Sequence, residues 1–451
     1  MMFDKLIKKI NIKDNVDLFL REVREENFNY KLIFFSSLID EYMVMELQRS
    51  LRLSKSIEDV YSKLDNIKIS ISNNIDEVIL LLHEGQVILY VEGNSYFILI
   101  DLRKVPSRSI SEPEVEKSLR GSKDGFNESL IVNVSLLRTR LKSNDLMIEA
   151  LRIGSYSKTS VCICYISSKV NFEKLLFLKN KLKKIDVESL IMSDRSLEEM
   201  LFDQNKTIFP LVRYSERPDV SSLYLMEGHI ILLVDTSSNA IIVPISIFDH
   251  MKNVEEYRQN FILGNLTKML RYFGILLSLF FLPLSYLLAT TSSLNNLYNL
   301  NIENTSSLPI WSQISIGLFV IELFRIAIIH TPNTLMSALS IVIGIILGEV
   351  SMSLGIFVKD VLIILSIFTI SSFSIPSYEL SLSNRVISIC LFIVSVLFGK
   401  VGFLIGIIIL FIHLVSIKVI GYPYLYPFIP LDIKKLKIKF FRKDVKKNKK
   451  V

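Results

Sequence analysis

The chain has 451 residues, of which 50% are hydrophobic, and a formal net charge of +7. Its mean hydropathy of +0.42 is high for a wholly water-soluble protein, and apolar runs of hydrocarbon length are confined to roughly the last 180 residues. Because much of the basic excess lies beside these runs, a lipid surface is a better partner than nucleic acid. The three cysteines lack C-x-x-C spacing, so they indicate neither a disulfide framework nor a structural zinc site.

The amino-terminal half begins without the apolar run of a cleaved signal peptide, and we expect it to stay in the cytoplasm. Three short apolar runs, Val78–Leu82, Val87–Val91 and Tyr96–Ile100, are separated by tight turns that contain Gly85 and Gly93. This pattern predicts three strands of a small antiparallel meander.

Part of the meander is repeated further along the chain. The segment EGQVILYVE at residues 84–92 and the segment EGHIILLVD at residues 227–235 align without a gap. An internal repeat of this kind predicts two related α/β subdomains, which we place at residues 1–150 and 151–262.

The second subdomain shows alternating strand and helix patterns. Val161–Ile166 predicts a buried strand that packs Cys162 and Cys164 in the core, Phe172–Leu182 a helix, and Phe209–Arg213 another strand. There is no nucleotide-binding loop, zinc-protease motif or nucleophile elbow, and the histidines are scattered. We therefore expect no catalytic, cofactor or metal site and no enzymatic activity.

The carboxyl-terminal half predicts an all-α, polytopic membrane bundle over residues 263–420. A helix needs about 20 mostly apolar residues to cross the hydrocarbon core. Candidate segments are Tyr272–Ala289, Ile314–Ile329, Leu335–Leu354, Val361–Ile375 and Val386–Ile417. The last run is too long for one straight span, and we expect the chain to reverse at residues 399–402.

Basic residues set the predicted orientation. Lys268 and Arg271 precede the first segment, the following loop has no lysine or arginine, and a basic tail occupies residues 421–451. Both chain ends should then face the cytoplasm, which requires an even number of crossings, six or four. The tail residues expected to face anionic lipid are Lys434, Lys435, Lys437, Lys439, Arg442 and Lys443.

Charged residues inside the apolar segments are costly unless they are paired or face water. Glu322 and Arg325 lie three residues apart on one helical face and are close enough to pair. Such a pair either holds the helices of the bundle together or lies at the membrane interface, or it belongs to a polar pathway or a contact between subunits. Glu349 lies near the end of its segment, where it either reaches the interface or faces a pore.

A hydroxyl stripe in the fourth segment, Ser366, Thr369 and Ser372, is typical both of a helix that lines a water-filled pore and of hydrogen bonding between helices. Glycines spaced by four residues let helix backbones approach closely. These helix-packing positions are Gly344, Gly348, Gly402 and Gly406.

Several contiguous blocks are distinctive. The main ones are ISEPEVE at 110–116, LRGSKDGFNE at 119–128, LRTRLK at 137–142, YSERPD at 214–219, IPSYELSL at 375–382 and GYPYLYPFIP at 421–430. These blocks resemble the GerA family of spore germination receptor A subunits, occur in the family's order and cover residues 110 to 432. Further blocks at 227–237, 330–333 and 377–385 resemble one branch of the family.

The resemblance implies a multi-pass protein of the spore inner membrane that acts in germination. It also implies a homo-oligomeric ring, a pentamer, that conducts cations and works with a second integral membrane subunit. Two other functions remain open from the residues. One is a non-conducting receptor or scaffold that senses a small molecule through the soluble half, and the other is a secondary transporter, although no inverted repeat is visible.

Overall fold

The computed structural model describes residues 2–10, 12, 15–24, 29–54, 68–103, 113, 116, 121–202, 207–253, 255–290, 306–330 and 340–441. The chain divides into two compact units. The first comprises Met1–Lys206, Leu211–Ile245 and Val419–Tyr422, and the second comprises Thr207–Pro210, Ser246–Lys418 and Pro423–Val451.

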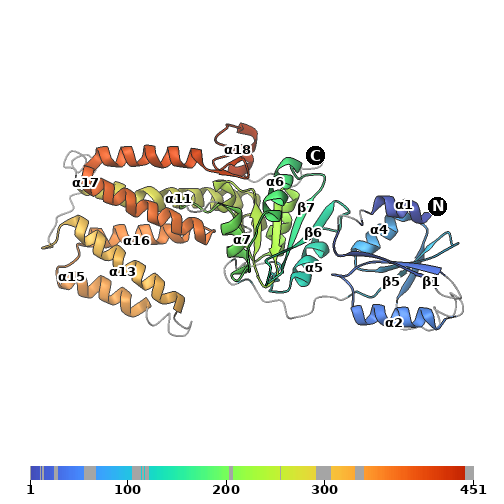
Figure 1. The fold of residues 1–451 in the computed structure, drawn as a ribbon. Coiled ribbons are helices and arrows are strands. Elements are labelled where there is room, and N and C mark those ends of the chain that lie inside the picture. The colour runs from blue at the N-terminus through green and yellow to red at the C-terminus, as the bar shows by residue number, and fades with distance from the viewer. Residues whose placement is uncertain are drawn as a thin grey trace. The chain divides into compact units, whose positions relative to one another are not determined.

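The first unit begins with a five-stranded antiparallel sheet whose two faces are covered by helices (Figure 1). In spatial order its strands are β1 (Leu18–Arg24), β2 (Asn29–Phe35), β4 (Val87–Val91), β5 (Phe97–Ile100) and β3 (Ile69–Ser72). α1 (Met2–Lys9) and α4 (Ile75–His83) pack on one face, and α2 (Glu41–Arg52) packs on the other. Alternating side chains of β2, β4 and β5 therefore belong to two separate apolar cores, one on each face of the sheet.

One of the three predicted strands of the meander is wrong. Val78–Leu82 lies within α4, and only the two later runs form strands. Asn74 caps this helix by accepting a hydrogen bond from the amide of Asp76, and acidic residues occupy its first turn. A continuous apolar run this short does not distinguish a buried strand from a buried helix, whereas the capping residue Asn74 favours a helix.

A second sheet has the same strand order as the first. Its strands are β6 (Leu146–Ile153), β7 (Thr159–Ile166), β9 (Ile230–Val234), β10 (Ala240–Val243) and β8 (Arg213–Ser215), and its helices are α5 (Leu130–Arg140), α6 (Phe172–Lys183), α7 (Ser193–Leu201) and α8 (Pro218–Met226). Every residue of β9 and β10 is buried, as expected for strands covered on both faces.

The predicted strand at 161–166 and the predicted helix at 172–182 are confirmed by β7 and α6. The predicted strand Phe209–Arg213 is wrong, because β8 starts only at Arg213. The boundary expected at residue 150 falls inside β6, so the second subdomain starts earlier than the sequence pattern suggested.

The internal repeat is confirmed as a repeat of structure. α4, β4 and β5 begin at Ile75, Val87 and Phe97, and α8, β9 and β10 begin 143 residues later in each case, at 218, 230 and 240. The equivalent glycines Gly85 and Gly228 both follow their helix with φ of 91°, a left-handed conformation that favours glycine. The first unit therefore consists of two related subdomains.

A buried ion pair joins these two subdomains. The Arg138 guanidinium, on α5, donates to the Asp17 carboxylate at 2.8 Å and to Asn15 Oδ1 at 2.7 Å. Asn15 also forms an isolated parallel bridge with Ile148 of β6. Arg138 and Asp17 are nearly inaccessible to solvent, so this ion pair is buried at the junction.

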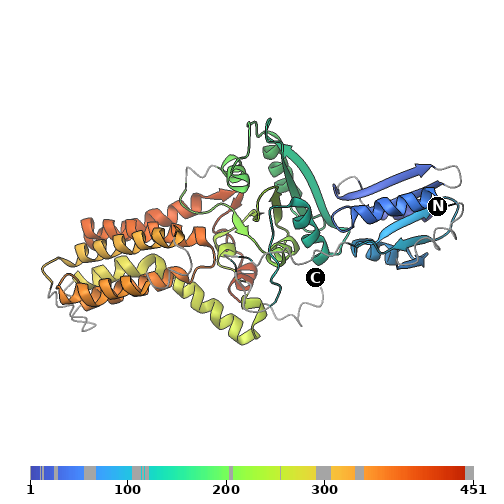
Figure 2. The ribbon, with the colours of Figure 1, turned by 90° about the horizontal axis from the view of Figure 1, so that it is seen from below.

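The second unit is helical, and its long helices lie side by side (Figure 2). They are α11 (Phe261–Thr290), α13 (Ile310–His330), α16 (Lys359–Phe373) and α17 (Tyr378–Ser416). Of the helices in the described residues, α11, α13 and α17 are long and apolar enough to cross a membrane. Shorter elements are α9 (Ile247–His250), α10 (Glu255–Arg258), η2 (Ile346–Val350), α15 (Ser351–Ser353) and α18 (Ile433–Phe440), and β11 (Lys418–Val419) pairs with β12 (Tyr422–Pro423).

The reversal predicted within the last apolar run is present at Gly399, whose backbone leaves the helical conformation with φ of 60° and ψ of −145°. An added Cβ at Gly406 would lie 2.7 Å from Leu391 Cδ2, so the two parts of α17 pack against each other. Proline 283 does not stop α11, which continues to Thr290.

The repeated glycine turn gives a test of the soluble fold. Gly228→Ala would force a left-handed backbone on alanine and bring its Cβ to 2.7 Å from the Lys169 carbonyl oxygen. Gly93→Ala is the matched control, because Gly93 also has positive φ but no atom lies within 4 Å of an added Cβ. We expect Gly93→Ala to cost about 1–2 kcal/mol of local stability and Gly228→Ala clearly more. Hydrogen exchange in the full chain measures this, at the β9 amides for Gly228→Ala and at the β4 amides for Gly93→Ala, and an equal loss of protection at the two places would contradict it.

Candidate functional site: a charged cluster in the helical bundle

Helix α13 places one acidic and one basic side chain a single turn apart. Arg325 Nε donates to Glu322 Oε2 at 2.8 Å, so the structure contains the ion pair that the spacing allowed. Both side chains are about a quarter exposed, at 25% and 24%. Their position inside an apolar helix makes mutual pairing the cheapest arrangement for two charges.

A second guanidinium, which the sequence analysis missed, completes the cluster. Arg385 of α17 donates through Nη1 to Glu322 Oε1 at 2.7 Å and through Nη2 to Ser372 Oγ of α16 at 2.6 Å. Arg385 is only 4% exposed. One carboxylate therefore binds arginines from two helices, and Arg385 links three: α13, α16 and α17.

The charges of this cluster do not cancel. Glu322, Arg325 and Arg385 together carry one more positive than negative charge. Within the described residues, Arg385 Nε and the Ser388 hydroxyl are buried and have no hydrogen-bond partner. Glu322 is then the one carboxylate that compensates two cations here, and losing it would leave a buried arginine without its counter-ion.

Polar contacts continue from the cluster to α11. Asn384, beside Arg385 in the chain, donates through Nδ2 to Ser278 Oγ at 3.2 Å. Gly274 of α11 faces Ser374 so closely that an added Cβ would collide with the hydroxyl. These contacts fix α11 against the same end of α16 and α17, by the small residues and hydrogen bonds that hold helices together in lipid.

The predicted hydroxyl stripe runs from this cluster along α16. Ser372 is buried in the cluster, Thr369 is half-buried, and Ser366 is exposed. The Thr369 and Ser366 hydroxyls each donate to a carbonyl oxygen one turn earlier, of Leu365 and Leu362. The three side chains thus follow one face of α16, from the interior of the bundle to its surface.

The other predicted residues lie apart from the cluster. Glu349 is exposed on η2. No described atom lies within 4 Å of a Cβ added at Gly344 or Gly348. In contrast, a Cβ at Gly402 would lie 2.7 Å from the Val394 carbonyl oxygen, so only the second glycine pair makes close contacts within the described chain.

The basic tail forms α18, which contains Lys434, Lys435, Lys437 and Lys439, whereas Arg442 and Lys443 lie outside the described residues. The helix packs on the start of α11. The rings of Phe440 and Tyr272 are 4.7 Å apart, and the Tyr272 hydroxyl donates to the Lys439 carbonyl oxygen at 2.9 Å. Lys439 also pairs with the buried Asp249.

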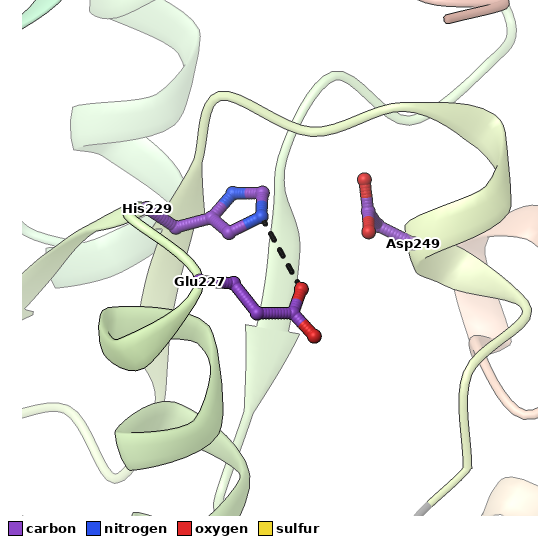
Figure 3. Close-up of side chains that lie close together, drawn as sticks. All are labelled: Glu227, His229 and Asp249. Carbon is purple, nitrogen blue, oxygen red and sulfur yellow. Dashed lines mark ion pairs between the residues drawn. The ribbon is translucent and has the colours of Figure 1, made fainter. Parts of the chain in front are cut away.

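A histidine lies at the repeated turn of the first unit. His229 Nδ1 lies 2.6 Å from the Pro244 carbonyl oxygen, which makes Nδ1 the proton-bearing nitrogen, and Nε2 faces the Glu227 carboxylate at 3.8 Å (Figure 3). The third side chain drawn there, Asp249, belongs to the second unit and pairs with Lys252 and Lys439 of that unit. Glu227 and His229 therefore form a local pair that closes the turn between α8 and β9.

Comparison with known proteins decides the family. A model of the Bacillus/Clostridium GerA spore germination protein matches residues 5–451. The chain belongs to the GerA family. The blocks quoted from the sequence therefore identified the family correctly, and the chain is a spore germination membrane protein.

Individual GerA-family relatives match most of the chain. Stage V sporulation protein AF of Bacillus subtilis is 34% identical over 95% of this chain and 89% of its own length. This protein represents the branch that the further sequence blocks resemble. Spore germination protein KA of Bacillus subtilis is 27% identical over 96% of this chain and 82% of its own length. Spore germination protein XA of Bacillus anthracis is 30% identical over 80% of this chain and 74% of its own length.

Among solved structures, the N-terminal domain of the A subunit of the Bacillus megaterium spore germinant receptor GerK3 matches with a TM-score of 0.41 and 22% identity. The match covers 54% of this chain and 92% of that domain.

A double-mutant cycle tests the cluster of this GerA-family bundle. Glu322→Gln should destabilise the bundle by about 3–5 kcal/mol, because it leaves the buried Arg385 without its counter-ion. Arg385→Gln should cost less, because Glu322 is partly exposed and keeps its pair with Arg325. The double variant should lose less than the sum, with a coupling above about 1 kcal/mol. Unfolding of the purified chain in mixed micelles of increasing denaturing detergent measures the four stabilities.

Glu349→Gln, which changes an exposed carboxylate of the same unit, is the control and should leave stability unchanged. If the losses at Glu322 and Arg385 simply added, the two side chains would not interact in the membrane.

Proposed function

We propose that this GerA-family protein is a membrane subunit of a spore germination complex and forms an oligomeric channel that releases cations during germination. Family membership supports the germination role. The observation that carries the channel proposal is the charged cluster, which anchors one end of a hydroxyl-bearing helix, α16, while the other hydroxyls run outward along it.

The exposed end of the stripe favours an assembly of several copies. A pore needs polar groups along a water-filled axis, and hydroxyls supply them without fixed charge. Ser366 is exposed in the single chain. In a ring of copies, which the resemblance implies to be a pentamer, this face of each α16 would border the shared axis, and a second integral membrane subunit would complete the complex.

The cluster itself is better suited to holding the helices than to conducting cations. Its excess charge is positive, which would repel a cation, and Arg385 is almost completely buried. We assign Glu322 and Arg385 the role of fixing α16 in its place beside α13 and α17. Glu349, exposed near the end of its segment, remains a candidate for contacts with lipid headgroups or another copy.

Contacts within the second unit support an even number of crossings. Tyr272 starts the first apolar segment and Phe440 follows the last one, yet their rings are in contact. Both ends of the bundle are basic, with Lys268 and Arg271 at one and the α18 lysines at the other. By the positive-inside rule, we propose that both ends face the cytoplasm at the spore inner membrane and that the exposed Lys434 and Lys437 contact anionic lipid there.

Ion flux from proteoliposomes tests the channel. The full chain, alone and together with the second membrane subunit of the complex, should release potassium or sodium from loaded vesicles. Thr369→Phe should reduce flux roughly tenfold or more by narrowing the pore. Ile367→Phe is the matched control, because Ile367 is also half-buried and lies two residues before Thr369, on the opposite side of α16.

Two outcomes would contradict the proposal. Absence of flux with every combination of membrane subunits would leave a non-conducting receptor or scaffold as the better account. Equal flux in the Thr369→Phe and Ile367→Phe variants would show that this face of α16 does not line the path.

A further inference from the structure

Helix α6 of the second subdomain is apolar on two sides. On one side, the side chains that pack into the subdomain are buried, and they are Leu175, Leu178 and Leu182. On the other side, Phe172, Leu176 and Phe177 are 62%, 61% and 47% exposed. A surface helix usually has a single apolar stripe, which faces the core. A second apolar side that faces outward therefore marks a surface that binds a partner.

The exposed side of α6 is also basic. Residues 169–184 contain six lysines and one acidic residue, Glu173. The exposed lysines among them are Lys169, Lys183 and Lys184. Lys179 pairs with Glu149 at 2.6 Å, and Asp186 and Glu188 follow only after the helix has ended, so the helix keeps a positive excess.

This combination of side chains favours lipid over another protein as the partner. Lysine is depleted in the contacts between proteins. In contrast, lysines beside exposed aromatic and leucine side chains are typical of a helix that lies on an anionic lipid surface.

The start of α6 is linked to the segment that follows the last membrane helix. Lys174 Nζ lies 4.0 Å from the centre of the Tyr422 ring, and both residues belong to the first unit. Helix α17, which is apolar and long enough to cross a membrane, ends at Ser416, and Tyr422 is the sixth residue after it. Six residues of extended chain reach about 20 Å at most. The start of α6 is therefore joined to the end of α17 by one contact and a short length of chain.

The later part of α6 has a similar link. Lys181 Nζ donates to the carbonyl oxygen of Leu201, the last residue of α7, at 2.8 Å. Thr207 is the sixth residue after Leu201, and its hydroxyl oxygen lies 3.1 Å from Nε2 of His413 in the last turn of α17. Two parts of α6 are thus joined to the same end of α17, and these lengths of chain allow its exposed side to reach the lipid surface there.

We propose that the exposed side of α6 binds the anionic surface of the bilayer that the bundle spans. Phe172, Leu176 and Phe177 insert among the lipid headgroups, and Lys183 and Lys184 pair with lipid phosphates. This contact anchors the second subdomain to the membrane at a place separate from the basic tail. It goes beyond the proposed channel and requires no ion flux, so each proposal can fail without the other.

Fluorescence quenching in nanodiscs tests this contact with the full chain. A dye is attached at Leu176→Cys in a Cys390→Ser background, in which the remaining cysteines, Cys162 and Cys164, are buried. The nanodiscs contain phosphatidylglycerol and phosphatidylcholine, and part of the phosphatidylcholine carries a nitroxide near its headgroup. Ile131→Cys on α5 is the matched control, because Ile131 is 64% exposed. We expect quenching at least about fivefold stronger at position 176 than at position 131, because only the dye at 176 enters the lipid.

Charge variants of the dye-labelled chain test the role of the lysines. Lys183→Gln combined with Lys184→Gln should lower the ratio of bound to unbound α6 roughly tenfold or more, because both lysines lose their attraction to anionic lipid. Lys5→Gln combined with Lys8→Gln is the control, since it removes two exposed lysines from α1 and should change nothing. Nanodiscs of phosphatidylcholine alone should weaken quenching as the α6 variant does.

Four results would overturn the proposal: no quenching at position 176, equal quenching at 176 and 131, equal effects of the two double lysine variants, or equal quenching with and without phosphatidylglycerol. A dye at 176 that is covered by a second copy of the chain would stay unquenched and give the first of these results. Every side chain changed in these variants is exposed, so the comparison does not depend on a substitution in the core.

Discussion

The helical unit depends on one carboxylate inside an apolar bundle. Glu322 accepts from Arg325 on its own helix and from Arg385 on α17, and Arg385 in turn donates to Ser372 on α16. Helices in lipid gain little from apolar contact, since lipid tails are as apolar as leucine. Fixed polar contacts between helices therefore determine which faces meet, and this cluster determines it for three of them.

The rest of the bundle is consistent with that constraint. The Asn384–Ser278 hydrogen bond and the close approach of Gly274 to Ser374 add α11 at the same end. The apolar core of Leu282, Ile314, Phe368 and Phe392 fills the space between the four helices. The hydroxyl face of α16 is thus held at the end that carries Ser372 and is exposed at the end that carries Ser366.

Much of the fold could be predicted from the sequence, because its strongest signals are local. The repeat between residues 84–92 and 227–235 needs no knowledge of contacts, and it proved to extend over a helix and two strands. The family could likewise be recognised from contiguous blocks. The error at Val78–Leu82 arose because an apolar run of five residues carries no period, and the boundary at 150 was placed too late because β6 mixes polar and apolar residues.

The site was only partly predictable because its members are distant in the chain. Glu322 and Arg325 are a turn apart, so helical spacing brings them together. Arg385 is 63 residues from Glu322 and lies just before the run that the hydropathy pattern begins at Val386, so it was not considered among the charged residues inside the apolar segments. The Arg138–Asp17 pair spans 121 residues and was equally invisible. The sequence signal that could have indicated Arg385 is an arginine at the edge of an apolar run that contains serines.

Magnetic-resonance distance measurement in lipid bilayers tests the central interaction most directly. Full-length protein would carry carbon-13 in the glutamate carboxylates and nitrogen-15 in the arginine guanidinium groups, with Arg325→Gln present to remove the neighbouring pair. We predict a strong dipolar coupling, as expected for the 2.7 Å contact between Arg385 Nη1 and Glu322 Oε1, that disappears in the further variant Arg385→Gln. A spectrum in which Arg385→Gln removes no coupling would show that the two side chains do not meet in the membrane.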